Sequence, residues 1–328
     1  MLPMLAMARR APVGICGLAL VVVSSACRDS TEPTPPTQTT GLIASTLTLS
    51  GRPHGVASIG DRFCVSQIGA DGVACGTVTE RDASLGASIS VGGAPAQVAL
   101  SPDGRTAYTA NQSGNTMSVV DVQAGRTVAT VPLLDGGSSL LVDASNTHVY
   151  VTTAGGTLDV IDAGSRQVIA TVPVGASPNG LALDAEAGRL YVSSRATNRI
   201  TVVSTATNAV LKTWEVGGKP QRIALSADRT LLYIASEAAG FEVLHLDNGV
   251  RNIAANVSPG AEGLALSPDG RRVYLTNPSE GRLYIIDPEA RMVITTLPGL
   301  ATPRNVAFTR GGTAALVTGE GGSVYVIR

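Results

Sequence analysis

The sequence has few charges and no excess of either sign. Only 15% of its 328 residues are Asp, Glu, Lys or Arg, and 24 basic residues stand against 25 acidic ones. A protein that binds nucleic acid needs a strongly basic face. This composition gives no such face, so we expect no nucleic-acid partner.

Residues that build metal and catalytic sites are also scarce. The chain has 3 histidines and 4 cysteines. Their spacings match neither a zinc site nor a haem attachment, and neither a phosphate-binding glycine loop before a helix nor a Gly-x-Ser-x-Gly motif occurs. We therefore expect no metal, no cofactor and no catalytic residues that sequence alone can name.

What the chain has instead is a repeat of about forty residues. A tyrosine recurs in steps of 41 or 42 residues, and Leu316 takes its place in the last copy. These tyrosines are Tyr108, Tyr150, Tyr191, Tyr233 and Tyr274. Such a period is typical of one supersecondary unit copied many times.

Each copy is predicted to form four short strands. In the second copy, segments rich in Val, Thr and Ala span 97–100, 106–110, 116–122 and 127–133. The Ser-Pro-Asp-Gly tetrad at 101–104 is typical of a turn. Four strands in about 40 to 45 residues indicate the blade of a β-propeller.

The number of copies predicts seven blades. They begin at Pro53, Pro95, Gly137, Pro178, Pro220, Ala261 and Pro303. The last copy holds only three strands, while segment 42–49 resembles the fourth strand of the third copy. Pairing that segment with the last blade leaves no long open edge. We expect an all-β, seven-bladed β-propeller of four-stranded antiparallel blades over 42–328, closed by its N-terminal strand.

These strands resemble a known family. The second strand Tyr274-Leu275-Thr276-Asn277 and third strands that end in Ile-Ile-Asp at 285–287 are similar to the YVTN-type β-propeller repeat proteins. The resemblance covers about residues 42–328. It implies a propeller of the surface-layer-like or cell-envelope kind, a family whose roles are mostly unassigned.

The first 41 residues predict export. Arg9 and Arg10 precede an apolar run at 13–23, followed by small residues, which is typical of a signal peptide over 1–26. Cys27 then resembles the lipidated cysteine of bacterial lipoproteins, although Ser24 stands where Leu is usual. The alternative is an ordinary signal peptide that leaves Cys27 incidental.

A Pro/Thr-rich tract follows Cys27, and residues 27–41 are predicted to be a disordered tether behind the lipid. We therefore expect a periplasmic or cell-surface protein that touches a membrane only through its lipid anchor.

Two further cysteines lie in the first copy. Cys64 and Cys75 are symmetric about a loop at 69–70, and residues symmetric about a hairpin turn face each other at disulfide distance. An oxidising compartment favours that bond. The alternative is two buried free thiols.

The candidate ligand site follows from the position after each blade's first residue, which approaches the central channel. His54, Glu262 and Arg304 hold this position on consecutive blades, and Asn179 and Gln221 hold it on two others. We treat these five as candidate ligand-binding residues. The alternative is a solvated rim whose charges pair locally and contribute little.

Two functions fit the sequence. One is a monomeric, lipid-anchored binding or scaffolding module without enzyme activity, whose partner is an envelope protein, a peptide or a small polar ligand. The other is a lactonase-type hydrolase in which His54, Glu262 and Arg304 polarise a lactone carbonyl and activate water. The second rests on analogy of fold.

Overall fold

The computed structural model describes residues 42–254, 256–309 and 311–328. The predicted signal peptide, Cys27 and the tether lie outside the described residues. Strands β1 to β28 form seven sheets of four antiparallel strands, and no helix occurs within the described ranges. The all-β prediction and the number of blades are therefore confirmed.

Each blade consists of an inner, a second, a third and an outer strand. The inner strands are β2 (Pro53–Ile59), β6 (Pro95–Leu100), β10 (Gly137–Val142), β14 (Pro178–Asp184), β18 (Pro220–Leu225), β22 (Leu264–Leu266) and β26 (Pro303–Phe308). The second strands are β3 (Arg62–Gln67), β7 (Thr106–Asn111), β11 (His148–Thr153), β15 (Arg189–Ser194), β19 (Leu231–Ser236), β23 (Val273–Asn277) and β27 (Ala315–Gly319).

The remaining strands form the outer half of each blade. The third strands are β4 (Gly72–Val78), β8 (Thr116–Asp121), β12 (Thr157–Asp162), β16 (Arg199–Ser204), β20 (Gly240–His245), β24 (Arg282–Asp287) and β28 (Ser323–Ile327). The outer strands are β5 (Ala83–Ser90), β9 (Arg126–Pro132), β13 (Gln167–Pro173), β17 (Val210–Glu215), β21 (Arg251–Ile253), β25 (Met292–Leu297) and β1 (Ile43–Thr48). Blades are numbered one to seven from β2 onward.

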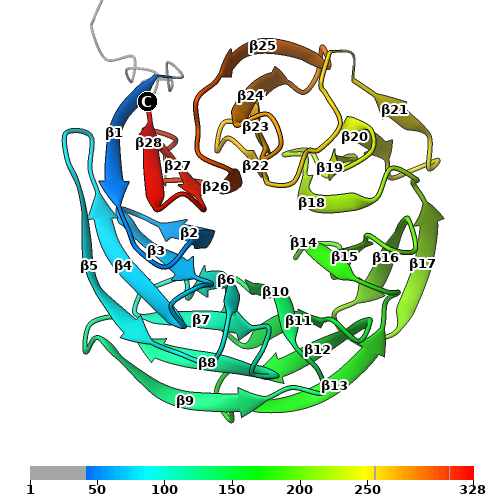
Figure 1. The fold of residues 1–328 in the computed structure, drawn as a ribbon. Helices are drawn as coiled ribbons and strands as arrows, with labels where there is room; N and C mark the ends of the chain where they lie inside the picture. The colour runs from blue at the N-terminus through cyan, green and yellow to red at the C-terminus, as the bar shows by residue number, and fades with distance from the viewer. Residues whose placement is uncertain (1–41, 255, 310) are drawn as a thin grey trace, which may run out of the picture. The chain divides into compact units, whose positions relative to one another are not determined.

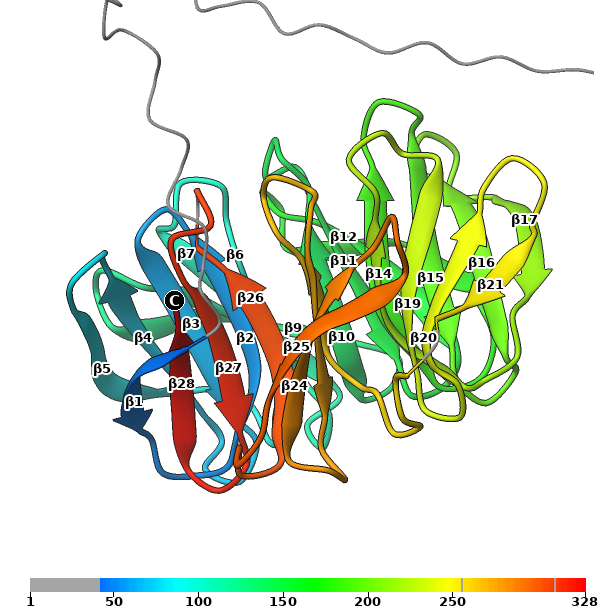
Figure 2. The ribbon, with the colours of Figure 1, turned by 90° about the horizontal axis from the view of Figure 1, so that it is seen from above.

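The ring closes as the sequence predicts. The inner strands contact one another in the order β2, β6, β10, β14, β18, β22, β26 and back to β2. Strand β1 pairs with β28 and completes blade seven, with Thr46 opposite Tyr325 (Figure 1). Figure 2 shows that the loops gather at the two opposite ends of the strands.

The hydrophobic core lies between the blades. Seven clusters of buried apolar side chains occur, and each joins two neighbouring blades. The recurring tyrosine explains the spacing of the repeat. Tyr108 of blade two, for example, packs with Leu140 and Val149 of blade three. The five copies that carry the tyrosine therefore bury its ring against the next copy, as stacked repeats require.

Blade one replaces this tyrosine with a disulfide. Cys64 and Cys75 face each other in β3 and β4 and are joined by an S–S bond of 1.99 Å. Cys64 packs with Val98 and Ala107 of blade two, so it occupies the junction that the tyrosine fills elsewhere. The predicted disulfide is confirmed.

Blade six departs from the expected boundary. Its inner strand begins at Leu264 rather than at Ala261. Two backbone hydrogen bonds still hold the preceding residues to β23: Glu262 N donates to Thr276 O at 3.0 Å, and Thr276 N donates to Gly263 O at 2.9 Å. Glu262 therefore keeps the position that the repeat assigns to it.

Candidate functional site

A pocket of about 260 Å³ opens at the end of the ring where the inner strands begin, which we call the mouth. Of the predicted ligand-binding residues, His54, Asn179 and Glu262 line it. Gln221 and Arg304 lie beside them, because Gln221 accepts a hydrogen bond from Asn179 Nδ2 and Arg304 Nη1 donates to Glu262 Oε2 at 2.5 Å. The structure brings these predicted residues together from five blades.

A local irregularity turns these side chains toward the axis. The pairing of inner and second strands shifts register within 53–56, 220–223 and 303–306. A β-bulge takes a residue out of the ladder and re-aims its side chain. His54 and Arg304 lie inside such bulges, so they face the mouth instead of a neighbouring blade.

A hydroxyl group on the second strand fixes the bulge of its own blade to the next blade. Thr318 Oγ1 accepts from Asn305 N at 3.0 Å and donates to His54 O at 2.5 Å. Equivalent pairs of hydrogen bonds are made by Ser193 with Gly180 N and Gln221 O, and by Thr276 with Gly263 N and Arg304 O. We call this arrangement the hydroxyl clamp. It holds the backbone at the mouth in place.

One side of the mouth is a chain of alternating charges. Arg304 binds both Glu262, at 2.5 Å, and Glu320, at 3.2 Å, and Arg52 binds Glu320 at 3.0 Å. Burial works against the charged form of Glu320, but hydrogen bonds from Arg52 and Arg304 outweigh it and lower its pKa. Arg304 is held in place by two carboxylates, so it is a rigid part of the wall.

His54 is held in one tautomer. Its Nδ1 lies 2.8 Å from Ala96 O, which can only accept, so Nδ1 carries the proton. Burial lowers the pKa of His54, and Arg222 and Arg304 add to this, against the opposing effects of Glu262 and of the hydrogen bond to Ala96. The ring is therefore neutral at pH 7. Its Nε2, 4.0 Å from Glu262 Oε1, is a hydrogen-bond acceptor.

A second group of charges surrounds Glu237 between blades four and five. Arg195 Nε donates to Glu237 Oε2 at 2.6 Å, Lys219 Nζ donates to Oε1 at 3.1 Å, and Gln221 Nε2 is 3.3 Å from Oε2. The hydrogen bond from Arg195 is the main cause of the lowered pKa of Glu237. Glu237 thereby ties the lining residue Arg195 to Gln221.

The sequence reasoning missed Arg222, which reaches across the axis. Its Nη1 donates to Ser139 Oγ at 2.5 Å and to Asn179 O at 3.0 Å, and its Nε donates to Asn305 Oδ1 at 3.1 Å. These acceptors belong to blades three, four and seven. The available signal was position: at the residue after each mouth residue, only blade five carries a charge.

The mouth residues differ in size from blade to blade. Blades two and three contribute Ala96 and Ser138, and the loop of blade three adds Ala154. Glu262, which also lines the pocket, is larger and carries the ion pair with Arg304. Small side chains thus leave a hollow that faces a charged wall.

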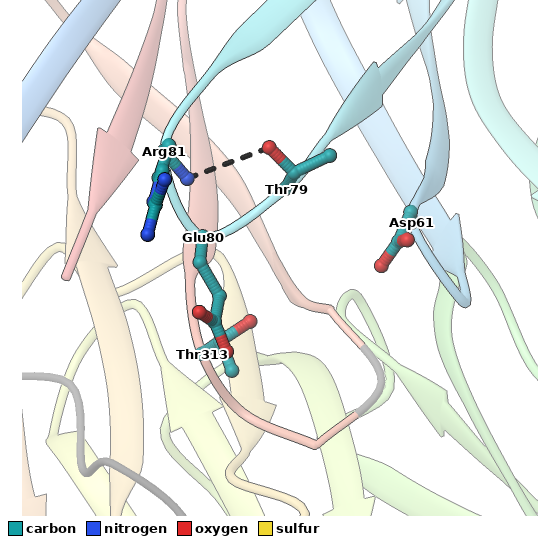
Figure 3. A pocket seen from close by; sticks show the side chains of 5 residues that line it. All are labelled: Asp61, Thr79, Glu80, Arg81 and Thr313. Atoms are coloured by element: carbon teal, nitrogen blue, oxygen red, sulfur yellow. Dashed lines mark hydrogen bonds between the residues drawn. The ribbon is translucent and has the colours of Figure 1, made fainter.

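A second hollow of about 520 Å³ lies at the opposite end of blades one and seven, lined by Asp61, Thr79, Glu80, Arg81 and Thr313 (Figure 3). The only hydrogen bond drawn among them joins Arg81 N to Thr79 Oγ1 at 3.4 Å. Apart from Thr313, these residues are exposed. Apart from this one long contact, their side chains are not held in place by one another, so this hollow is the weaker candidate.

Within the described ranges, no three His, Cys, Asp or Glu side chains are grouped to hold a metal ion. The described residues also contain no helix that is long and apolar enough to span a membrane.

Comparisons with known proteins bear on the fold. No family model and no curated protein matches this chain. Among solved structures, it is similar to hydrazine synthase of Kuenenia stuttgartiensis, with a TM-score of 0.75 and 17% identity over 87% of this chain and 97% of that chain. This similarity shows a shared fold alone.

Proposed function

We propose that this protein is an exported, lipid-anchored β-propeller that binds a small polar ligand at the mouth, as part of a YVTN-type envelope family. The observation that carries the proposal is a pocket whose polar walls are already fixed by protein contacts. Its lining residue Glu262 is paired with Arg304, and Arg195 is paired with Glu237. Walls fixed before binding lower the cost of ordering side chains around a ligand.

The position of the pocket supports binding there. Ligand sites are concave, with a few polar groups that converge on one space. Here the polar side chains come from five blades and differ from one blade to the next. At most other positions of the repeat, equivalent residues are similar. At the mouth the residues differ between blades, and this loss of repeat symmetry allows a specific ligand to be recognised there.

The experiment is a thermal-shift screen of small polar metabolites against the exported protein, repeated with Glu262→Gln and with Thr213→Val as control. Thr213 is exposed on β17, away from the mouth. A ligand should raise the melting temperature of the wild type and of Thr213→Val, and raise that of Glu262→Gln much less. Equal shifts for all three proteins would contradict binding at the mouth.

Anchoring needs its own test. Cys27→Ser should release the protein from the membrane fraction and remove the mass of the lipid. Unchanged membrane association of the variant would contradict the anchor.

One observation favours the lactonase-type alternative. Neutral His54 leaves Nε2 as an acceptor beside the pocket, and such a group can take a proton from water as a general base. Hydrolysis of a lactone panel that disappears in His54→Gln would support this activity. Turnover that persists in the variant, or no turnover by the wild type, would contradict it.

A further inference from the structure

Arg222 is a cation with only neutral partners. Its three hydrogen bonds go to a serine hydroxyl, a backbone carbonyl and an asparagine side chain. None of the described carboxylates lies within 4.0 Å of it, although the charge of Glu262 acts on it from farther away. Arginine at such an enclosed position usually pairs with a carboxylate or phosphate.

The charge of Arg222 remains at neutral pH. Withdrawal from bulk water lowers the pKa of Arg222 to about 10, which still leaves the guanidinium protonated. The side chain keeps part of its surface open, and its Nη2 is not among the buried atoms without a partner. One donor edge is therefore available to a ligand in the channel.

Unlike Arg222, the other cations described above each have a carboxylate partner. The ion-paired residues and Arg222 together comprise five permanent cations against three carboxylates, with His54 neutral. The cations are Arg52, Arg195, Lys219, Arg222 and Arg304, and the carboxylates are Glu237, Glu262 and Glu320. The whole chain, in contrast, has a net charge of −1. Asp71, Asp135 and Glu280 lie in loops at the same end of the ring, so an anion is favoured there by Arg222, which lacks a carboxylate partner among the described residues, and not by a net positive charge.

Two residues that line the pocket either accept a hydrogen bond from Arg222 or adjoin a residue that does. Asn179 lines the pocket with its side chain and accepts from Arg222 with its backbone oxygen. Ser138 lines the pocket next to Ser139, the other acceptor of Nη1. Arg222 does not itself line the pocket, so the charged group of a ligand reaches the guanidinium by extending past Asn179 and Ser138.

We infer that the ligand of the mouth is a small carboxylate, whose charged group sits against Arg222 and supplies the missing counter-charge. This inference rests on the proposed binding function and names the class of ligand. The volume of about 260 Å³ is below the roughly 300–1,000 Å³ typical of drug-sized ligands, so it admits a small acid or a single chain end. A free organic acid and a peptide C-terminus offer the same carboxylate.

The test is calorimetric titration of the exported protein with matched pairs of probes. Succinate is compared with succinamide, and triglycine with its C-terminal amide. A charged hydrogen-bonded pair should make the carboxylate about ten- to a hundredfold tighter than its neutral twin. If succinate binds more tightly than triglycine, the carboxylate comes from a free acid. If triglycine binds more tightly than succinate, it comes from the end of a peptide chain.

Three variants assign the effect to Arg222. Arg222→Met should lose that preference, whereas Arg126→Met, an exposed arginine at the far end of blade two, should keep it. Arg222→Lys keeps the charge without the planar fork and should retain part of the preference. If Arg222→Met does not fold, the lysine variant and competition by about 0.5 M chloride serve in its place, and both should weaken binding.

Equal binding of the neutral twins, unchanged binding by Arg222→Met, or no binding of any carboxylate probe would overturn the inference. A neutral ligand that depends on Glu262 but not on Arg222 would overturn it and leave the binding function standing. Failure of every compound in the metabolite screen would overturn both.

Discussion

The hydroxyl clamp gives a quantitative test of how the mouth is held together. Thr276 is fully buried, and its Oγ1 accepts from Gly263 N at 2.8 Å and donates to Arg304 O at 2.7 Å. Replacing it by valine keeps the shape of the side chain and removes both hydrogen bonds. A buried backbone N–H of blade six and a partly buried backbone carbonyl of blade seven then lose a partner.

The expected cost follows from these two groups. A buried donor or acceptor without a partner costs about 1–3 kcal/mol. The added methyl group of valine regains about 0.8 kcal/mol through its burial. We therefore expect Thr276→Val to lower the free energy of unfolding by about 1–5 kcal/mol. Thr276→Ser keeps the hydroxyl and should cost only about 1 kcal/mol for the lost methyl group.

Urea denaturation and thermal unfolding measure the loss. The control is Thr213→Val on the exposed face of β17, which should change stability by no more than about 0.5 kcal/mol. If Thr276→Val is as stable as Thr213→Val, the clamp is not what joins blades six and seven. A larger cost for Thr276→Ser than for Thr276→Val would mean that the methyl group, and not the hydroxyl, matters there.

Three other predictions address the disulfide, the histidine and the N-terminus. Replacing Cys64 and Cys75 by alanine should cost about 3 kcal/mol, the loop entropy of a bond between residues 11 apart, and dithiothreitol should lower the melting temperature of the wild type but not of the variant. Because burial lowers the pKa of His54, the unfolded chain binds more protons than the folded protein below about pH 6.5. The free energy of unfolding should therefore fall as the pH drops through that range, and it should fall less steeply in His54→Gln. A steeper fall in the variant contradicts the assigned neutral ring. Cys27→Ser protein should appear in the soluble fraction, and its retention in the membrane would speak against lipidation.

Much of the fold could be predicted because it is built from local pattern. Turn residues and alternating strands are encoded within each copy, and the constant spacing of Tyr108 and its equivalents reveals the period. The same symmetry placed His54, Glu262 and Arg304 at one end of the ring, since equivalent residues of a closed repeat share one face. The fourth strand at 42–49 was recognisable because it resembles another copy.

The partners of the mouth residues were not predictable in the same way. Thr276 matches the repeat pattern, yet its role as a clamp depends on Arg304 O of the following blade. Arg222 interrupts the pattern by a single charge, and nothing near it in the sequence shows that its guanidinium reaches Ser139, which lies 83 residues away.

Repetition, closure and the disulfide hairpin were therefore determined by the sequence itself, because each depends on neighbours within one copy or on the count of copies. The tertiary structure alone decided which charges meet at the axis, which tautomer His54 adopts and where the pocket opens. Those outcomes depend on side chains from several blades that meet only after the ring has closed, so their geometry and desolvation have no local signature.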